Sequence, residues 1–165
     1  ESFQNATDKL TNLSLENEQE LKSLILGTNI DSSSSGTLTS SLDLLWNSIN
    51  VLKKNATVVI ISENSKGFGS QALEKLAYGK LKLQDYGNYD YVDGLEHLMF
   101  INSLSEKYSV AILSSLPKYY LKEKFGFNIF SNVQEAAEKI LDINGKSHRI
   151  SLVQDPNIAI FKKGN

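Results

Sequence analysis

The sequence lacks cysteine, and its 165 residues include only two histidines and two prolines. The absence of cysteine excludes disulfides, thiolate metal sites and thiol nucleophiles. The two histidines, His97 and His148, lie far apart in the chain, so the sequence predicts no metal site built by this chain alone. Any metal or redox chemistry is therefore expected to depend on a group that is held elsewhere.

The charges are nearly balanced, with 17 basic and 19 acidic side chains. This balance gives no electrostatic reason to expect nucleic acid or an anionic membrane as a partner. No apolar run approaches the roughly 20 residues of a membrane span, and residues 1–20 are too polar for a secretory signal. We therefore expect a cytoplasmic protein. Because the chain begins with Glu1, we also expect it to be processed or cut from a longer protein.

The spacing of apolar residues predicts a fold in which helices alternate with strands. Apolar residues recur at helical spacing in segments with helix caps, and short apolar runs lie between them. The expected helices are residues 15–26, 42–54, 72–77, 93–104, 117–125 and 133–141. The expected strands are residues 58–61, 110–113, 127–130, 149–153 and 158–161. In the last helix, Ser131 and Gln134 have the spacing of a capping box.

This alternation predicts an α/β fold with three layers, in which a mostly parallel sheet carries helices on both faces, as in Rossmann-like domains. The two last strands are expected to form an antiparallel edge. We expect residues 1–30 to be a helical lead-in and residues 31–165 to form the α/β domain.

Two glycine-containing loops are candidate binding segments, because ligands of open α/β sheets bind at the carboxyl ends of the strands. Gly67 and Gly69 follow the expected strand at 58–61 and would let the backbone approach an anion closely. Ser34, Ser35 and Gly36 belong to the run SSSSGT, whose hydroxyls and glycine suit an anion-binding nest. The alternatives are a structural turn for the first loop and a flexible polar connector for the second.

Two further features are weaker candidates. Glu96 and His97 are adjacent on an expected helix, where neighbouring side chains point about 100° apart and do not form a catalytic pair by themselves. The alternative is an exposed or hydrogen-bonded histidine, and we expect His148 to be a surface residue. Tyrosines and aspartates interleave in residues 78–93, which favours packing on the protein itself or on a partner protein over stacking on bases.

The order of several segments resembles the C-terminal domain of the nickel-dependent lactate racemase family. The resemblance extends from about residue 32 to residue 163. The matching segments are SSSSGTLTSSLDLLWNSINVLKK, VVIISENSKGFGS, DGLEHLMF, VAILSSLP, GFNIFSNVQEAAEKIL and a last strand pair.

The resemblance implies a protein of two domains. In this family the N-terminal domain holds a nickel pincer nucleotide and the catalytic histidines, and the C-terminal domain closes over that cofactor and contributes polar residues to the cleft. The resemblance therefore implies an N-terminal domain as partner, a small 2-hydroxy acid as substrate, and no cofactor bound by this chain alone. In the expected register, Leu44, Leu45 and Ser48 replace the tyrosine, glutamine and lysine of lactate racemases, so lactate itself is not implied.

From the sequence we therefore expect the C-terminal domain of a racemase-like protein, which forms one wall of an interdomain cleft and is inactive alone. The expected cleft residues are Ser34, Ser35, Gly36, Gly67 and Gly69, followed by Glu96 and His97 as weaker catalytic candidates. The alternative is a stand-alone module that binds a ligand or a protein and has no catalytic activity.

Overall fold

The computed structural model describes residues 14–17, 20–28, 36–82, 90–154 and 160–163. The strands in these residues are β1 (Ser14–Asn17), β2 (Leu21–Gly27), β3 (Leu52–Ile61), β4 (Ser109–Leu113), β5 (Asn128–Ile129), β6 (Ser151–Gln154) and β7 (Ile160–Lys163). The helical elements are α2 (Leu38–Ser48), η1 (Ile49–Val51), α3 (Gln71–Ala77), α4 (Leu95–Ser105), η3 (Tyr120–Lys124) and α5 (Val133–Asn144).

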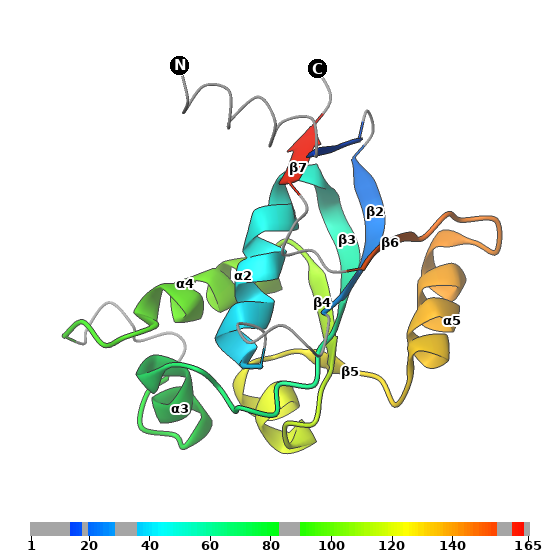
Figure 1. Cartoon of the computed structure of the whole chain (residues 1–165). Coiled ribbons are helices and arrows are strands. Elements are labelled where there is room, and N and C mark those ends of the chain that lie inside the picture. Colours follow the sequence, from blue (N-terminus) through cyan, green and yellow to red (C-terminus); the bar gives the residue numbers. More distant parts are fainter. Residues whose placement is uncertain (1–13, 18–19, 29–35, 83–89, 155–159, 164–165) are drawn as a thin grey trace, which may run out of the picture.

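A parallel sheet with the strand order β5-β4-β3-β2-β6 forms the centre of the fold. Helices α2, α3, α4 and the π-helical turn η3 cover one face, and α5 covers the other (Figure 1). The side chains of β3 alternate between the two cores, because Val58 and Ile60 face the larger one while Val59 faces α5. This arrangement confirms the expected three-layer α/β fold. None of the helices in the described ranges is long and apolar enough to cross a bilayer.

The prediction of a helix at residues 15–26 is wrong, because this segment contributes to the strands β1 and β2. Strand β2 lies between β3 and β6, and its residues 23–26 are all buried. Four consecutive buried residues suit a strand that is covered on both faces, whereas a helix at a surface would expose one of its sides. The leucine and glutamate content that favoured a helix is overridden by burial on both faces of the sheet.

The second expected helix begins and ends earlier than predicted. Thr37 caps α2 by accepting a hydrogen bond from the backbone N–H of Ser40 (3.3 Å), and the helix ends at Ser48. A 3₁₀ turn follows, and residues 52–54, which we expected to be helical, already belong to β3.

The expected antiparallel edge is also wrong. Strand β6 runs parallel to β2 in the central sheet, and β7 runs parallel to β1 in a separate two-stranded sheet. The two last strands therefore pair with the two first strands and not with each other. Near the other edge, β5 comprises only Asn128 and Ile129, which is shorter than the strand expected at residues 127–130.

The N-terminal cap of α5 is displaced by one residue from the expected capping box. Asn132 Oδ1 accepts the backbone N–H of Glu135 (2.8 Å), and Glu135 Oε2 accepts the N–H of Ser131 (2.6 Å). Asn132 and Glu135 therefore perform the roles that the sequence pattern assigned to Ser131 and Gln134.

Replacement of the cap residue should destabilise the protein measurably. We expect Asn132→Ala to lower the free energy of unfolding by about 1 kcal/mol, because the first turn of α5 loses its side-chain acceptor. The matched control is Ser131→Ala, which should change it by less than about 0.5 kcal/mol, because the backbone of Ser131 makes the contact with Glu135. Urea unfolding followed by circular dichroism measures both values. Equal losses in the two variants would contradict the assigned cap.

Candidate functional site

The loops that follow β3 and β4 are joined by hydrogen bonds at the carboxyl end of the sheet. The backbone N–H of Ser62 donates to the carbonyl of Leu113 (3.0 Å), which extends the pairing of the two strands. The Ser115 backbone N–H and hydroxyl both donate to the carbonyl of Glu63, at 2.9 and 2.7 Å. These contacts hold the segments that border the candidate site in one arrangement.

Asn64 connects three segments at this edge of the sheet. Its Oδ1 accepts the hydroxyls of Ser41 (2.8 Å) and Ser62 (2.9 Å), and its Nδ2 donates to the hydroxyl of Ser114 (3.1 Å). The residue is buried and has a φ of 54°, a left-handed conformation that asparagine tolerates better than most residues. Sequence reasoning missed this residue, since one asparagine in a polar loop gives no signal of burial.

The turn that contains Gly67 and Gly69 lies across the beginning of α2. The first backbone N–H groups of this helix, those of Leu38 and Thr39, donate to the carbonyls of Gly67 (3.0 Å) and Phe68 (3.1 Å). Since the N–H of Ser40 donates to the Thr37 hydroxyl, the donors of the first turn that could receive an anion already have partners within the protein. An anion at this end of α2 would have to be bound mainly by side chains.

The structure brings Gly36, Gly67 and Gly69 together, whereas Ser34 and Ser35 lie outside the described residues. It also brings in Lys66, whose backbone N–H donates to the carbonyl of Gly36 (2.7 Å). A Cβ at Gly36 would lie 2.8 Å from Cδ of Lys66, so this side chain passes directly over the glycine. Lys66 therefore places its side chain beside Gly36 just before α2, a feature that the sequence order did not reveal.

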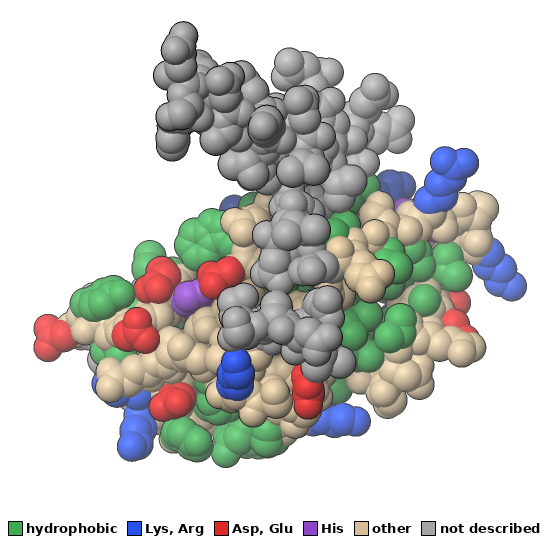
Figure 2. Space-filling view, in the orientation of Figure 1, with side chains coloured by type: hydrophobic (Ala, Val, Ile, Leu, Met, Phe, Trp, Pro, Cys, Tyr) green, Lys and Arg blue, Asp and Glu red, His purple; other side chains and the backbone are tan. Residues whose placement is uncertain are grey.

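His97 forms the second part of the site, on the surface that α2 and α4 share. Its Nε2 lies 2.9 Å from Oδ1 of Asp43 in α2, and its Nδ1 lies 3.5 Å from Oε1 of Glu96. The Nδ1 atom is buried and has no hydrogen-bond partner among the described residues. Figure 2 shows acidic side chains gathered around a histidine over these two helices. Sequence reasoning missed Asp43, which precedes His97 by 54 residues.

The outward side of α2 differs from the one expected from the resemblance. Leu44, Leu45 and Ser48 are buried in the core, so these three residues do not face a cleft. The side chains of α2 that are not buried follow one another along the helix: Thr39, Ser40, Asp43, Trp46 and Asn47. We call these five residues the α2 stripe. The polar residues that α2 offers to a ligand are therefore those of the stripe.

The remaining sequence candidates do not join this site. The Nε2 atom of His148 lies 2.8 Å from the Ser23 hydroxyl, so this histidine is half-buried against β2 and is not a simple surface residue. Tyr78 and Tyr91 are exposed, whereas Tyr86 and Tyr89 lie outside the described residues. Within the described ranges, no group of three or more histidines and carboxylates could hold a metal ion.

The geometry thus defines a parallel α/β domain with a polar candidate site, which lies at the beginning of α2 and along the outward side of this helix. No family model matches the sequence, and no curated protein matches it. Among solved structures, the fold is similar to that of the lactate racemase apoprotein from Thermoanaerobacterium thermosaccharolyticum, with a TM-score of 0.73 at 10% sequence identity. The match covers 94% of this chain but only 39% of that protein. The similarity supports the α/β fold, and this chain spans well under half the length of the racemase.

Proposed function

We propose that this chain is the C-terminal α/β domain of a divergent lactate racemase-like protein and forms one wall of an interdomain cleft for a 2-hydroxy acid. The observation that carries the proposal is the structural similarity, which extends over nearly the whole chain and leaves more than half of the racemase unmatched. The unmatched part leaves room for a second domain. The order of the sequence motifs, which resembles the same family, is a separate line of support.

The cleft wall in this proposal is the α2 stripe together with Lys66 and His97. The Lys66 ammonium would bind the substrate carboxylate, because a charged donor makes short and strong bonds to a carboxylate. Asp43 holds the imidazole of His97 by its Nε2 atom and would position it beside the substrate hydroxyl. The acidic groups at 43 and 96 disfavour a second anion next to His97, so the carboxylate is expected at the Lys66 end.

The described residues of this chain do not fit a nickel site of their own, because they contain no cluster of three or more suitable donors. In our proposal the nickel pincer nucleotide is therefore held by the N-terminal domain. This chain contributes no metal ligand, and its role is limited to binding and orienting the substrate and covering the cleft.

The proposal predicts a clear difference between the isolated chain and the full-length protein. The purified 165 residues should bind no stoichiometric nickel after incubation with nickel salts, measured by plasma mass spectrometry, and should not racemise L-lactate. The gene should encode a preceding domain rich in histidine and lysine. Nickel bound tightly by this chain alone, or a start codon immediately before Glu1, would overturn the proposal and favour a stand-alone binding module.

In the full-length protein, the site is tested by Asp43→Asn. We expect this change to lower turnover of 2-hydroxy acids about tenfold or more, because it removes the carboxylate that orients His97. The matched control is Asp142→Asn in α5, an exposed carboxylate on the opposite face of the sheet. If both variants keep full activity, the α2 stripe does not line the cleft.

A further inference from the structure

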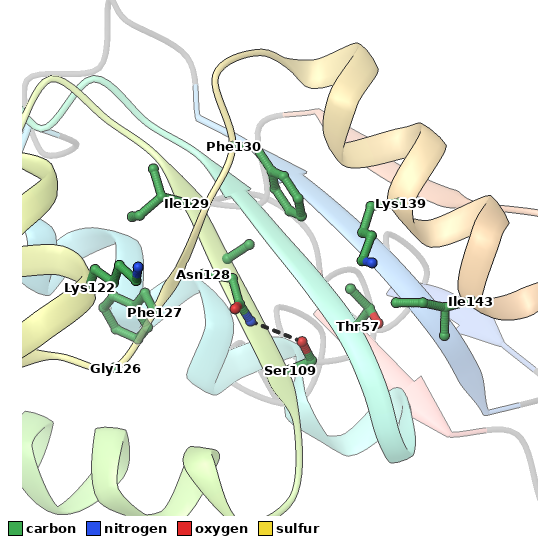
Figure 3. A pocket seen from close by; sticks show the side chains of 11 residues that line it. Thr57, Ser109, Lys122, Gly126, Phe127, Asn128, Ile129, Phe130, Lys139 and Ile143 are labelled. Atoms are coloured by element: carbon green, nitrogen blue, oxygen red, sulfur yellow. Dashed lines mark hydrogen bonds between the residues drawn. The ribbon is translucent and has the colours of Figure 1, made fainter.

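A cavity of about 600 Å³ lies at the edge of the sheet, between α5 and the edge strand β5, and extends past β5 to η3 (Figure 3). Its volume is within the range of small-molecule sites. The residues that line it come from β3, β4, η3, β5, α5 and the segments beside β5. None of them belongs to the α2 stripe or to the loops of the candidate cleft.

The cavity exists because α5 covers only part of its face of the sheet. The helix is anchored by Ala136 and Ile140, which pack on Val59 and its neighbours in β2 and β4. One turn further on, Ile143 is 59% exposed, although an apolar side chain at this position of an amphipathic helix would ordinarily be buried. At Gly126, no atom lies within 4 Å of the position of a Cβ, so this side of the cavity is open.

The floor of the cavity carries neutral polar groups. Thr57 and Ser109 are partners in the parallel register of β3 and β4, so their side chains lie next to each other on the α5 face. The amide of Asn128 donates to the hydroxyl of Ser109 (3.1 Å). Thr57 is 5% exposed, and its hydroxyl makes no hydrogen bond to a described residue. Among the described residues, only Nδ1 of His97 is a buried polar side-chain atom without a partner, so the Thr57 hydroxyl is accessible from the cavity and can donate to a ligand or to water.

Two lysines flank these groups, and no carboxylate lines the cavity. Figure 3 shows Lys122 of η3 on one side and Lys139 of α5 on the other, with the Nζ atom of Lys139 directed towards the sheet. In the described part of the chain, neither lysine forms an ion pair. The rest of the wall is apolar, and Phe130 and Ile143 are its largest side chains on the α5 face, whereas the ring of Phe127 is buried in the larger core.

We propose that this cavity binds a small amphipathic organic anion. The apolar body of the ligand lies against Phe130 and Ile143, and its carboxylate or phosphate group lies between Lys122 and Lys139. The hydroxyls of Thr57 and Ser109 donate hydrogen bonds from the floor, because the amide of Asn128 already donates to Ser109 and to the carbonyl of Val110. The site is independent of the proposed racemase cleft, because it lies at the β5 edge of the sheet beside α5 and shares no residue with the cleft.

The test is a titration of the ¹⁵N-labelled chain followed by NMR. The probes are 4-phenylbutyrate and phenyl phosphate, and the neutral control is 4-phenylbutanol. We expect one or both anions to give saturable shifts of the amides of Ser109, Asn128 and Ile129 and no shift at Asn64. The more tightly bound anion identifies the preferred head group. No saturable shift at about 10 mM of either anion, or equal binding of the alcohol, would overturn the proposal.

Charge-neutralising variants separate this site from general attraction to a lysine-bearing surface. The double variant Lys122→Gln/Lys139→Gln should weaken binding of the preferred anion about tenfold, because both charged donors are lost. The control Lys118→Gln/Lys146→Gln removes two exposed lysines outside the cavity and should leave the affinity unchanged. Unchanged circular dichroism spectra verify that all four substitutions leave the fold intact. Equal weakening in both double variants would show that the cavity is not the site.

Discussion

Replacement of Asn64 by alanine should lower the free energy of unfolding by about 3 kcal/mol, one of the two largest effects that we expect of a single substitution. The hydroxyls of Ser41 and Ser62 would lose their common acceptor while remaining buried. Alanine would also have to adopt the left-handed conformation with a φ of 54°. Urea unfolding at equilibrium measures the loss.

The matched control is Asn55→Ala, because Asn55 has a similar φ of 63° but is exposed. This variant should lose only about 1 kcal/mol, which is the cost of the left-handed backbone. The difference between the two variants measures the hydrogen bonds of Asn64. Losses of the same size would show that these bonds contribute nothing to stability.

The variant Gly69→Ala should be destabilised by a similar amount, about 3 kcal/mol, and should loosen the beginning of α2. A Cβ at this position would lie 2.6 Å from Cβ of Thr37 and would overlap the hydroxyl of Thr39. The residue also has a φ of 87°, which strains any side chain. Relief of the overlap requires the turn to move away from α2 and to break its hydrogen bonds. Urea unfolding measures the stability, and amide exchange at Leu38 and Thr39 reports the movement.

Gly67→Ala provides the control for this prediction. Its φ of 90° is almost the same, but no atom lies within 4 Å of the added Cβ. We expect the free energy of unfolding to fall by about 1 kcal/mol. The amide exchange rate at Leu38 should change by less than about tenfold. If the two alanine variants behave alike, then backbone strain alone explains both, and the contact between the turn and α2 has no separate role.

The sequence predicts the α/β fold well because most of its evidence is local. The apolar runs at 58–61 and 110–113 and the helical spacing of α3 and α5 are properties of single segments. The segment at 21–27 was wrongly predicted because its structure depends on β3 and β6, which bury it from both sides. The direction of the last strands was wrong for the same reason, since a short apolar run carries no information about the partner with which it pairs.

In the candidate site, too, local features could be predicted from the sequence, whereas contacts between distant segments could not. Gly67 and Gly69 could be identified from the sequence because a glycine after a strand marks a turn or a close approach of the backbone. The contacts of Asp43 with His97 and of Lys66 with Gly36 join segments that are distant in sequence, and no spacing rule connects them. Leu44, Leu45 and Ser48 occupy the register of the polar cleft residues of the racemases, but all three are buried in the core. A register taken from a resemblance does not establish which side of a helix is buried.

The place of β2 in the sheet has a consequence for how the protein is made. Ser23 in β2 and its partner His148, just before β6, are 125 residues apart. At roughly 5–20 residues per second, a ribosome synthesises that interval in roughly 6 to 25 seconds. For that period one side of β2 exposes unpaired backbone groups, and for most of it Ile25 also lacks the α5 residues that cover it. The nascent chain therefore carries an open, aggregation-prone strand until β6 has left the ribosome.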